Sequence, residues 1–127
     1  MEKNTKNTYT ITREGSAGSV KIADEVVAVI AGIASMEVEG VASMAGNTTK
    51  DIMQKLGRKS LSKGVKIEIQ DNVVKVYLAL NIKYGNNIME ITKNVQEKVK
   101  TAIENMTGLS VTDVNVRVAG VNVSEEQ

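Results

Sequence analysis

Residues 22–40, IADEVVAVIAGIASMEVEG, carry acidic side chains at both ends and an uncharged run from Val26 to Ala34 between them. Asp24 and Glu25 place negative charge where the free N–H groups of a first helical turn favour it. Gly40 is a residue type that commonly follows the last turn of a helix. We therefore predict a helix that begins near Asp24 and ends by Gly40.

Apolar residues recur at helical spacing along this helix in two adjacent strips. Val26, Val29, Ile30 and Ile33 form the first strip, and Val27, Ala31 and Ala34 form the second. A helix that is apolar on two strips is buried on more than one side. Its partner is either its own domain or a second subunit, and both interpretations stay open. The candidate contacts with a partner or with another copy are Val27, Ile30, Ala31 and Ala34.

Composition limits the chemistry of the chain. Its 127 residues suit one domain with a single core. It has no Cys and no His, which excludes thiol nucleophiles, imidazole bases and metal sites built on those ligands. The spacing of Ser60 and Lys63 in a polar loop is too common to indicate a catalytic pair. We predict no catalytic residue, no metal, no cofactor and no small-molecule substrate. Tyr9, Tyr77 and Tyr84 are the only aromatic residues, so stacking of nucleotide bases is disfavoured.

The two ends of the chain are polar. Residues 1–18 are predicted to be a mostly flexible arm in which Tyr9 to Ile11 could add a short edge strand, and residues 124–127 form an acidic tail. The domain is predicted to span residues 19–123. No uncharged stretch reaches the roughly 18 to 20 residues that cross a bilayer. We therefore expect a cytoplasmic protein.

Residues 65–84 hold the clearest strand signal, because two runs of alternating apolar residues meet at Asp71 and Asn72. These residues tolerate the positive φ of a two-residue hairpin turn. The second run is longer than the first, so its far end should pair with another strand. The turn predicts that Gln70 faces Val73, Ile69 faces Val74, Ile67 faces Val76 and Val65 faces Leu78, with Glu68 and Lys75 forming an ion pair on the other side.

A second long helix follows, with Asn87 and Glu90 in the spacing of an N-terminal cap and Gly108 at its exit. The last strand turns Val114, Val116 and Val118 inward, and its alternation shifts at Ala119 and Gly120, as a bulge produces. The apolar stripe of the helix is predicted to contain Ile88, Ile91, Val95, Val99, Ala102, Ile103 and Met106.

Residues 41–45 fit a short strand, and a short amphipathic helix is predicted around Ile52, Met53 and Leu56. We therefore predict an α+β fold: one two-layer domain whose antiparallel or mixed sheet of about four strands carries two longer helices and one short helix.

Positive residues outnumber the single Asp51 in residues 50–66, the basic loop. Such a loop is either a solvated, solubilising surface or a contact for an anionic partner. Under the second interpretation, the candidate contacts are Lys55, Arg58, Lys59 and Lys63. The anionic partner could be a lipid surface, an acidic protein or RNA.

Two parts of the sequence together resemble the alkaline shock protein family, the general-stress and envelope-stress proteins of Gram-positive bacteria. They are IADEVVAVIAGIASMEVEGVASM near the start, and GRKSLSKGVKIEI with VYLALNIKYG and KVKTAIENMTGL further on. The resemblance covers about residues 18–123. It lies in the order and texture of the segments and includes no catalytic signature.

The resemblance implies a non-enzymatic cytoplasmic protein of cell-envelope homeostasis and alkaline or general stress. It implies action through self-association or through an envelope-associated partner, which could hold the protein at the inner face of the membrane. It also suggests a regulatory link to fatty-acid synthesis. The alternative from the residues is an RNA- or anionic-membrane-binding module that uses the basic loop.

Overall fold

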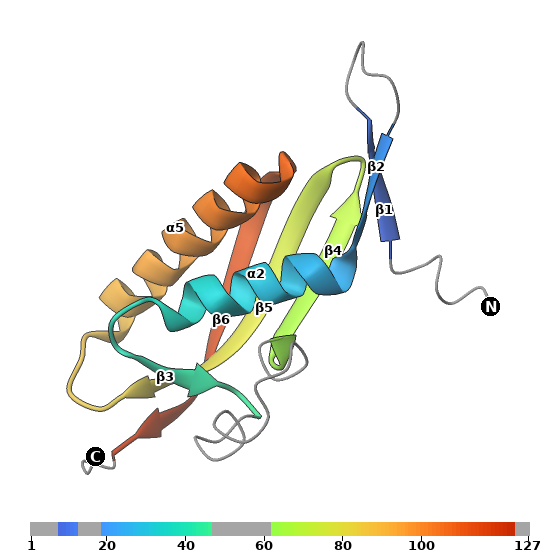
Figure 1. The fold of residues 1–127 in the computed structure, drawn as a ribbon. Coiled ribbons are helices and arrows are strands. Elements are labelled where there is room, and N and C mark those ends of the chain that lie inside the picture. The colour runs from blue at the N-terminus through green and yellow to red at the C-terminus, as the bar shows by residue number, and fades with distance from the viewer. Residues whose placement is uncertain (1–7, 13–18, 47–61, 124–127) are drawn as a thin grey trace.

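The computed structural model describes residues 8–12, 19–46 and 62–123 (Figure 1). These residues form one small α+β fold, as predicted from the sequence. The predicted short helix around Ile52 lies outside the described residues. In chain order, the elements are β1 (Thr8–Thr12), β2 (Ser19–Ala23), α2 (Asp24–Met36), β3 (Val41–Met44), β4 (Val65–Gln70), β5 (Val73–Lys83), α5 (Ile88–Thr107) and β6 (Ser110–Asn122).

Strand β5 is the centre of a mixed four-stranded sheet. It pairs antiparallel with β3 and β4 and parallel with β6. The Ala79 N–H donates to the Gly64 carbonyl at 2.9 Å, and the Ala79 carbonyl accepts from the Ala45 N–H at 2.8 Å. Because both groups of one strand residue point to the same side, β3 and β4 lie end to end along one edge of β5. Strand β6 occupies the other edge.

The sheet has a covered face and an open face. The covered face carries Val74, Val76, Leu78, Leu80 and Ile82 of β5, which are all buried. Helices α2 and α5 pack on this face and against each other, as Figure 1 shows. The parallel β5–β6 pair requires a long crossover, which α5 supplies. The alternate residues of β5 point to the opposite, open face.

The predicted hairpin is confirmed in its register and in its turn. All four predicted pairs occur, from Gln70 with Val73 next to the turn to Val65 with Leu78. Asp71 and Asn72 have φ values of 55° and 66°, which a type I′ turn needs. The predicted ion-pair partner of Lys75, the Glu68 carboxylate, accepts a hydrogen bond from the Tyr77 hydroxyl at 3.3 Å.

Helix α5 has the predicted ends. The Asn87 side chain accepts a hydrogen bond from the Glu90 N–H at 3.0 Å, and Gly108 adopts the left-handed conformation after the last turn. The predicted stripe is buried along the middle of the helix, from Ile91 to Ile103. Its two ends, Ile88 and Met106, are exposed, because only the central turns lie over α2 and the sheet.

Helix α2 begins at Asp24, as predicted, but ends at Met36, before Gly40. Gly40 has a φ of +102°, and a Cβ atom there would lie 2.6 Å from the Ile91 Cδ1 atom. Gly40 is therefore needed by the turn into β3 and by the close approach of α5, and it does not cap α2. The bulge predicted in β6 is confirmed, since its pairing with β5 shifts between Leu80–Val118 and Asn81–Gly120.

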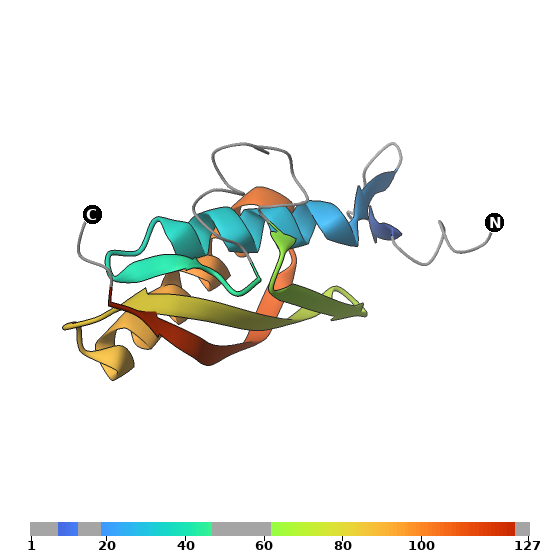
Figure 2. The ribbon, with the colours of Figure 1, turned by 90° about the horizontal axis from the view of Figure 1, so that it is seen from below.

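Strands β1 and β2 form a separate two-stranded antiparallel sheet. The strand predicted at Tyr9 to Ile11 is present, and it extends from Thr8 to Thr12. Its partner β2 runs without a loop into α2. The hairpin of β1 and β2 projects from one end of the domain, and the C-terminal end of β6 lies at the other end in both views (Figures 1 and 2).

Candidate functional site

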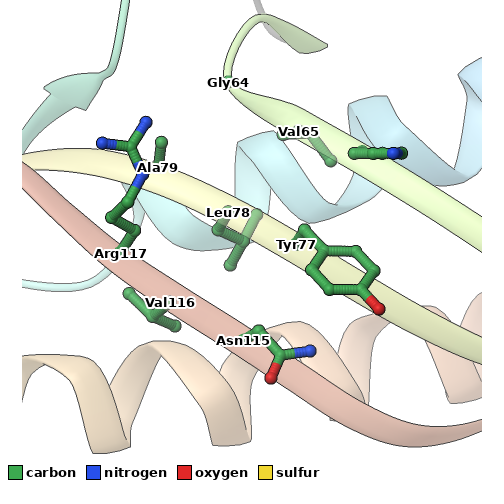
Figure 3. A pocket seen from close by; sticks show the side chains of 9 residues that line it. Gly64, Val65, Tyr77, Leu78, Ala79, Asn115, Val116 and Arg117 are labelled. Atoms are coloured by element: carbon green, nitrogen blue, oxygen red, sulfur yellow. The ribbon is translucent and has the colours of Figure 1, made fainter.

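The open face of the sheet contains a shallow depression of about 510 Å³ (Figure 3). Strand β5 forms its floor, β4 borders one side, and β6 borders the other. Gly64 has no side chain and Ala79 has only a methyl group, so neither residue fills the depression. The lining residues are Gly64, Val65, Lys66, Tyr77, Leu78, Ala79, Asn115, Val116 and Arg117.

Positive charge borders this depression on both sides. Lys66 comes from β4 and Arg117 from β6, and both are exposed. In Figure 3 the Arg117 side chain extends beside Ala79, and the Tyr77 ring lies toward the other end of the depression. The Asn115 amide donates to the Val76 carbonyl at 3.4 Å, which ties that side chain to the sheet. The arrangement offers donors and cations, which suit a carboxylate or a phosphate.

The residues predicted as partner contacts on α2 lie in the domain's own core. Val27, Ile30, Ala31 and Ala34 are buried against the sheet and α5. Of the two interpretations of the apolar helix, this is burial within its own domain. The strip of Val27, Ala31 and Ala34 therefore packs on its own sheet. Val26 and Ile33 of the first strip are each 41% exposed, so the outer side of α2 is partly apolar.

The predicted basic contacts are only partly within the described residues. Lys55, Arg58 and Lys59 lie outside them. Lys63 is exposed in the turn before β4, close in the chain to Gly64 and Lys66 of the depression. Lys66, the last residue of the basic loop, is therefore part of the positively charged border of the open face.

Several exposed apolar side chains near one end of the domain were not predicted from the sequence. Tyr84 follows β5, and its N–H donates to the Asn122 carbonyl at 3.0 Å, which places it beside the end of β6. Helix α5 begins at the same end of the domain (Figures 1 and 2). The members of this group, here called the apolar end, are Tyr84, Ile88, Met89, Val121 and Val123, with exposed fractions between 43 and 76%.

Part of the apolar end could have been found from the sequence. Met89 lies outside the predicted stripe of α5, so a periodic pattern places it on the solvent side. The exposure of Ile88 was not predictable, because its spacing is that of a core residue. Val121 and Val123 follow the bulge, where the local alternation no longer tells which side is covered.

Helix α5 also covers part of the outer edge of β6. Gln96 donates to the Val114 carbonyl at 3.0 Å, and Lys100 donates to the Val111 carbonyl at 3.2 Å. Glu104 accepts from the Val111 N–H at 2.9 Å, and this bond holds the pKa of Glu104 below its ordinary value, with Lys100 lowering it further. These three side chains, one turn apart, satisfy backbone groups that an edge strand leaves free.

The sequence as a whole matches a family of known proteins. The model of the alkaline shock protein 23 family, described by a cell envelope-related function, matches residues 12–123. The chain belongs to this family. The resemblance noted from the sequence is thereby confirmed, and the family is related to the cell envelope.

Relatives of this chain occur in Gram-positive bacteria. The uncharacterized protein YqhY of Bacillus subtilis is 36% identical over 104 residues, which make up 82% of this chain and 77% of YqhY. A stress response regulator gls24 homolog of Streptococcus pyogenes is 27% identical over 122 residues, 95% of this chain and 68% of the relative. Among solved structures, a variant of the MamM CTD has a TM-score of 0.48 at 12% identity, covering 76% of this chain and 94% of that one.

Two features are absent from the described residues. Within them, no helix combines the length and the apolar character needed to cross a membrane. The same residues contain no group of three or more acidic side chains close enough together to hold a metal ion.

Proposed function

We propose that this chain is a non-enzymatic interaction or scaffold protein of the envelope and alkaline stress response. It acts by self-association or by docking another envelope-associated protein, and through such a partner it is held at the inner face of the membrane. The observation that carries the proposal is the apolar end, in a family with a cell envelope-related function. Exposed apolar clusters on small domains commonly mark sites of protein association.

The apolar end is suited to docking because its side chains come from separate elements that share one end of the domain. Tyr84 and Met89 are about three-quarters exposed, so neither contributes much to the core. Covering them would remove apolar surface from water at little cost in polar desolvation. The partner is therefore expected to present an apolar surface of its own.

A pair of substitutions tests this proposal. Tyr84→Ser with Met89→Glu should remove most partners recovered with the protein from stressed cells of its own host, as measured by mass spectrometry. Met106→Glu is the matched control, because Met106 is 70% exposed at the other end of the same helix. It should leave the recovered proteins unchanged. Equal partner sets for both variants would show that the apolar end does not dock partners.

A regulatory link to fatty-acid synthesis is a further part of this proposal, and only the family resemblance supports it. A strain that lacks the protein should then show an altered fatty-acid composition of its membrane, measured by gas chromatography. An unchanged composition under alkaline stress would remove this part of the proposal without affecting the scaffold role.

A second candidate function is binding to RNA or to an anionic membrane surface. The observation that favours it is the positive border of the open face, where Lys66, the last residue of the basic loop, lies beside Tyr77 and Arg117 lies beside Ala79. Each basic residue near a charged membrane contributes about 1 kcal/mol. Binding by such a surface would weaken steeply as salt is raised.

Charge reversal separates this candidate from the first. Lys66→Glu with Arg117→Glu should abolish any binding to RNA or to anionic vesicles, assayed separately. The control is Lys93→Glu with Lys98→Glu on the exposed side of α5. If the wild-type protein binds neither probe at low salt, this candidate function is wrong.

A further inference from the structure

The β1–β2 hairpin lacks the support that small sheets require. It has only two strands of five residues each. Strand β2 contacts the start of α2, and its Ile22 packs against the core, whereas β1 pairs only with β2 within the described residues. An isolated two-stranded hairpin is marginally stable in water. Each of its strands also has one edge whose backbone groups the other strand does not pair. The hairpin would therefore gain stability by joining a larger sheet.

The four-stranded sheet offers a matching free edge on β6. Up to Val114, the outer edge is covered by the side chains of α5. The Asn122 carbonyl points inward to Tyr84, so by strand alternation the N–H and carbonyl groups of Val121 point outward. The N–H and carbonyl groups of Val116 and Val118 also point outward in the plane of the sheet, because they continue the alternation from the Val114 carbonyl, while their side chains face the core. In the described part of the chain, β6 pairs only with β5.

The surroundings of this free edge favour strand addition. Residues 116–121 are a longer stretch than the five residues of β1. Their only charged side chain is Arg117, which lies on the open face beside Ala79, and β1 carries no charge. Val121 and Val123 are exposed next to this edge and would be covered by an added strand. An unblocked, apolar edge of this kind is a template for another strand.

The two free edges lie at opposite ends of the domain in both views (Figures 1 and 2). The hairpin of a molecule therefore lies far from the free end of its own β6. Because the two surfaces are different, their contact is heterologous, and each added copy brings one unused hairpin and one unused edge. Such an assembly continues to grow head to tail and does not stop at a dimer.

We propose that β1 of one copy adds to residues 116–121 of β6 in the next copy, which gives a head-to-tail chain of subunits. This inference rests on the self-association in the proposed function and names its geometry. Strand β1 is the added strand because β2 continues directly into α2 and has its own domain beside it.

Two proline variants of the full chain test the two halves of this contact. Val121→Pro removes an outward N–H and no bond to β5, which an edge strand tolerates. Thr10→Pro disables β1. The controls Val121→Thr and Thr10→Val keep the N–H groups. Val121→Lys is a second edge variant that leaves the backbone unchanged, in case the proline variant fails to fold as judged by circular dichroism.

Sedimentation velocity over a wide concentration range gives the readout. We expect the wild-type protein and both controls to form species larger than a dimer, in amounts that rise with concentration. Val121→Pro, Val121→Lys and Thr10→Pro should each remain a monomer. A mixture of Val121→Lys with Thr10→Pro should form a heterodimer that grows no further, because each variant retains one half of the contact.

Three outcomes would overturn the inference. If Val121→Lys and Thr10→Pro assemble like the wild type, the strand-addition geometry is wrong while self-association stands. If both are monomers but their mixture forms no heterodimer, the two edges do not pair with each other. If the wild-type protein is a monomer throughout, self-association itself fails, and only docking of another protein remains of the proposed function.

Discussion

At the scale of single residues, α5 covers part of the outer edge of β6 with side chains that a helical wheel places on the solvent side. Gln96, Lys100 and Glu104 each make a hydrogen bond to the β6 backbone. Glu104 is the most sensitive of them to pH, because the Val111 N–H and then Lys100 favour its charged form and lower its pKa. The charged form is thus favoured more in the folded than in the unfolded state.

We predict that Glu104→Gln reduces the loss of stability in acid. A group with a lowered pKa in the folded state stabilises the protein above its ordinary pKa of about 4.5, and that contribution is lost as the pH falls through the folded-state value. Urea midpoints of the wild type should therefore fall more steeply with acid than those of the variant. The opposite effect of Asp24, whose pKa is raised by burial, is common to both proteins and cancels. Parallel curves would contradict the role given to Glu104.

We also predict that Asn87→Ala lowers the free energy of unfolding by about 1 kcal/mol, because the Glu90 N–H loses its capping acceptor. Asn94→Ala, in the exposed middle of the same helix, is the control and should be neutral or slightly stabilising. Equal effects in urea unfolding would mean that the cap contributes nothing.

At the scale of elements, the junction between β3 and β4 limits which residues can stand at Gly64. Gly64 has a φ of +80°, and a Cβ atom there would lie 2.9 Å from the Ala79 carbonyl oxygen. Gly85 has a similar φ of +98° with open space around it. Gly85→Ala should cost about 1 kcal/mol from the backbone alone. Gly64→Ala should cost clearly more in urea unfolding, and equal costs would mean that the junction relaxes freely.

At the scale of the whole molecule, β1 pairs only with β2 within the described residues, so the domain from residue 19 to residue 123 remains a prediction with a direct test. Removing residues 1–18 should change the free energy of unfolding of the monomer by less than about 0.5 kcal/mol. Removing residues 1–23 should cost more, because Ile22 packs against the core. A large loss from the shorter deletion would show that β1 belongs to the domain.

The sequence by itself determined the local structure of this protein. The type I′ turn at Asp71 and Asn72, the register of the hairpin, the cap at Asn87, the exit at Gly108 and the bulge after Val118 were all predicted. Each of these depends on residues close together in the chain, where side-chain period and turn chemistry act directly. The family was also evident from the order of these segments.

Only the tertiary structure decided which surfaces remain free. It buried Val27 and Ala31 in their own core, left Ile88 and Val121 exposed, and joined β5 to β6 in parallel, so that one sheet edge is open where α5 does not reach. None of this follows from periodicity. A repeating pattern shows that a side chain is apolar on a given face, but what covers that face depends on pairings between distant residues, such as Val41 with Ile82 and Val73 with Ser110.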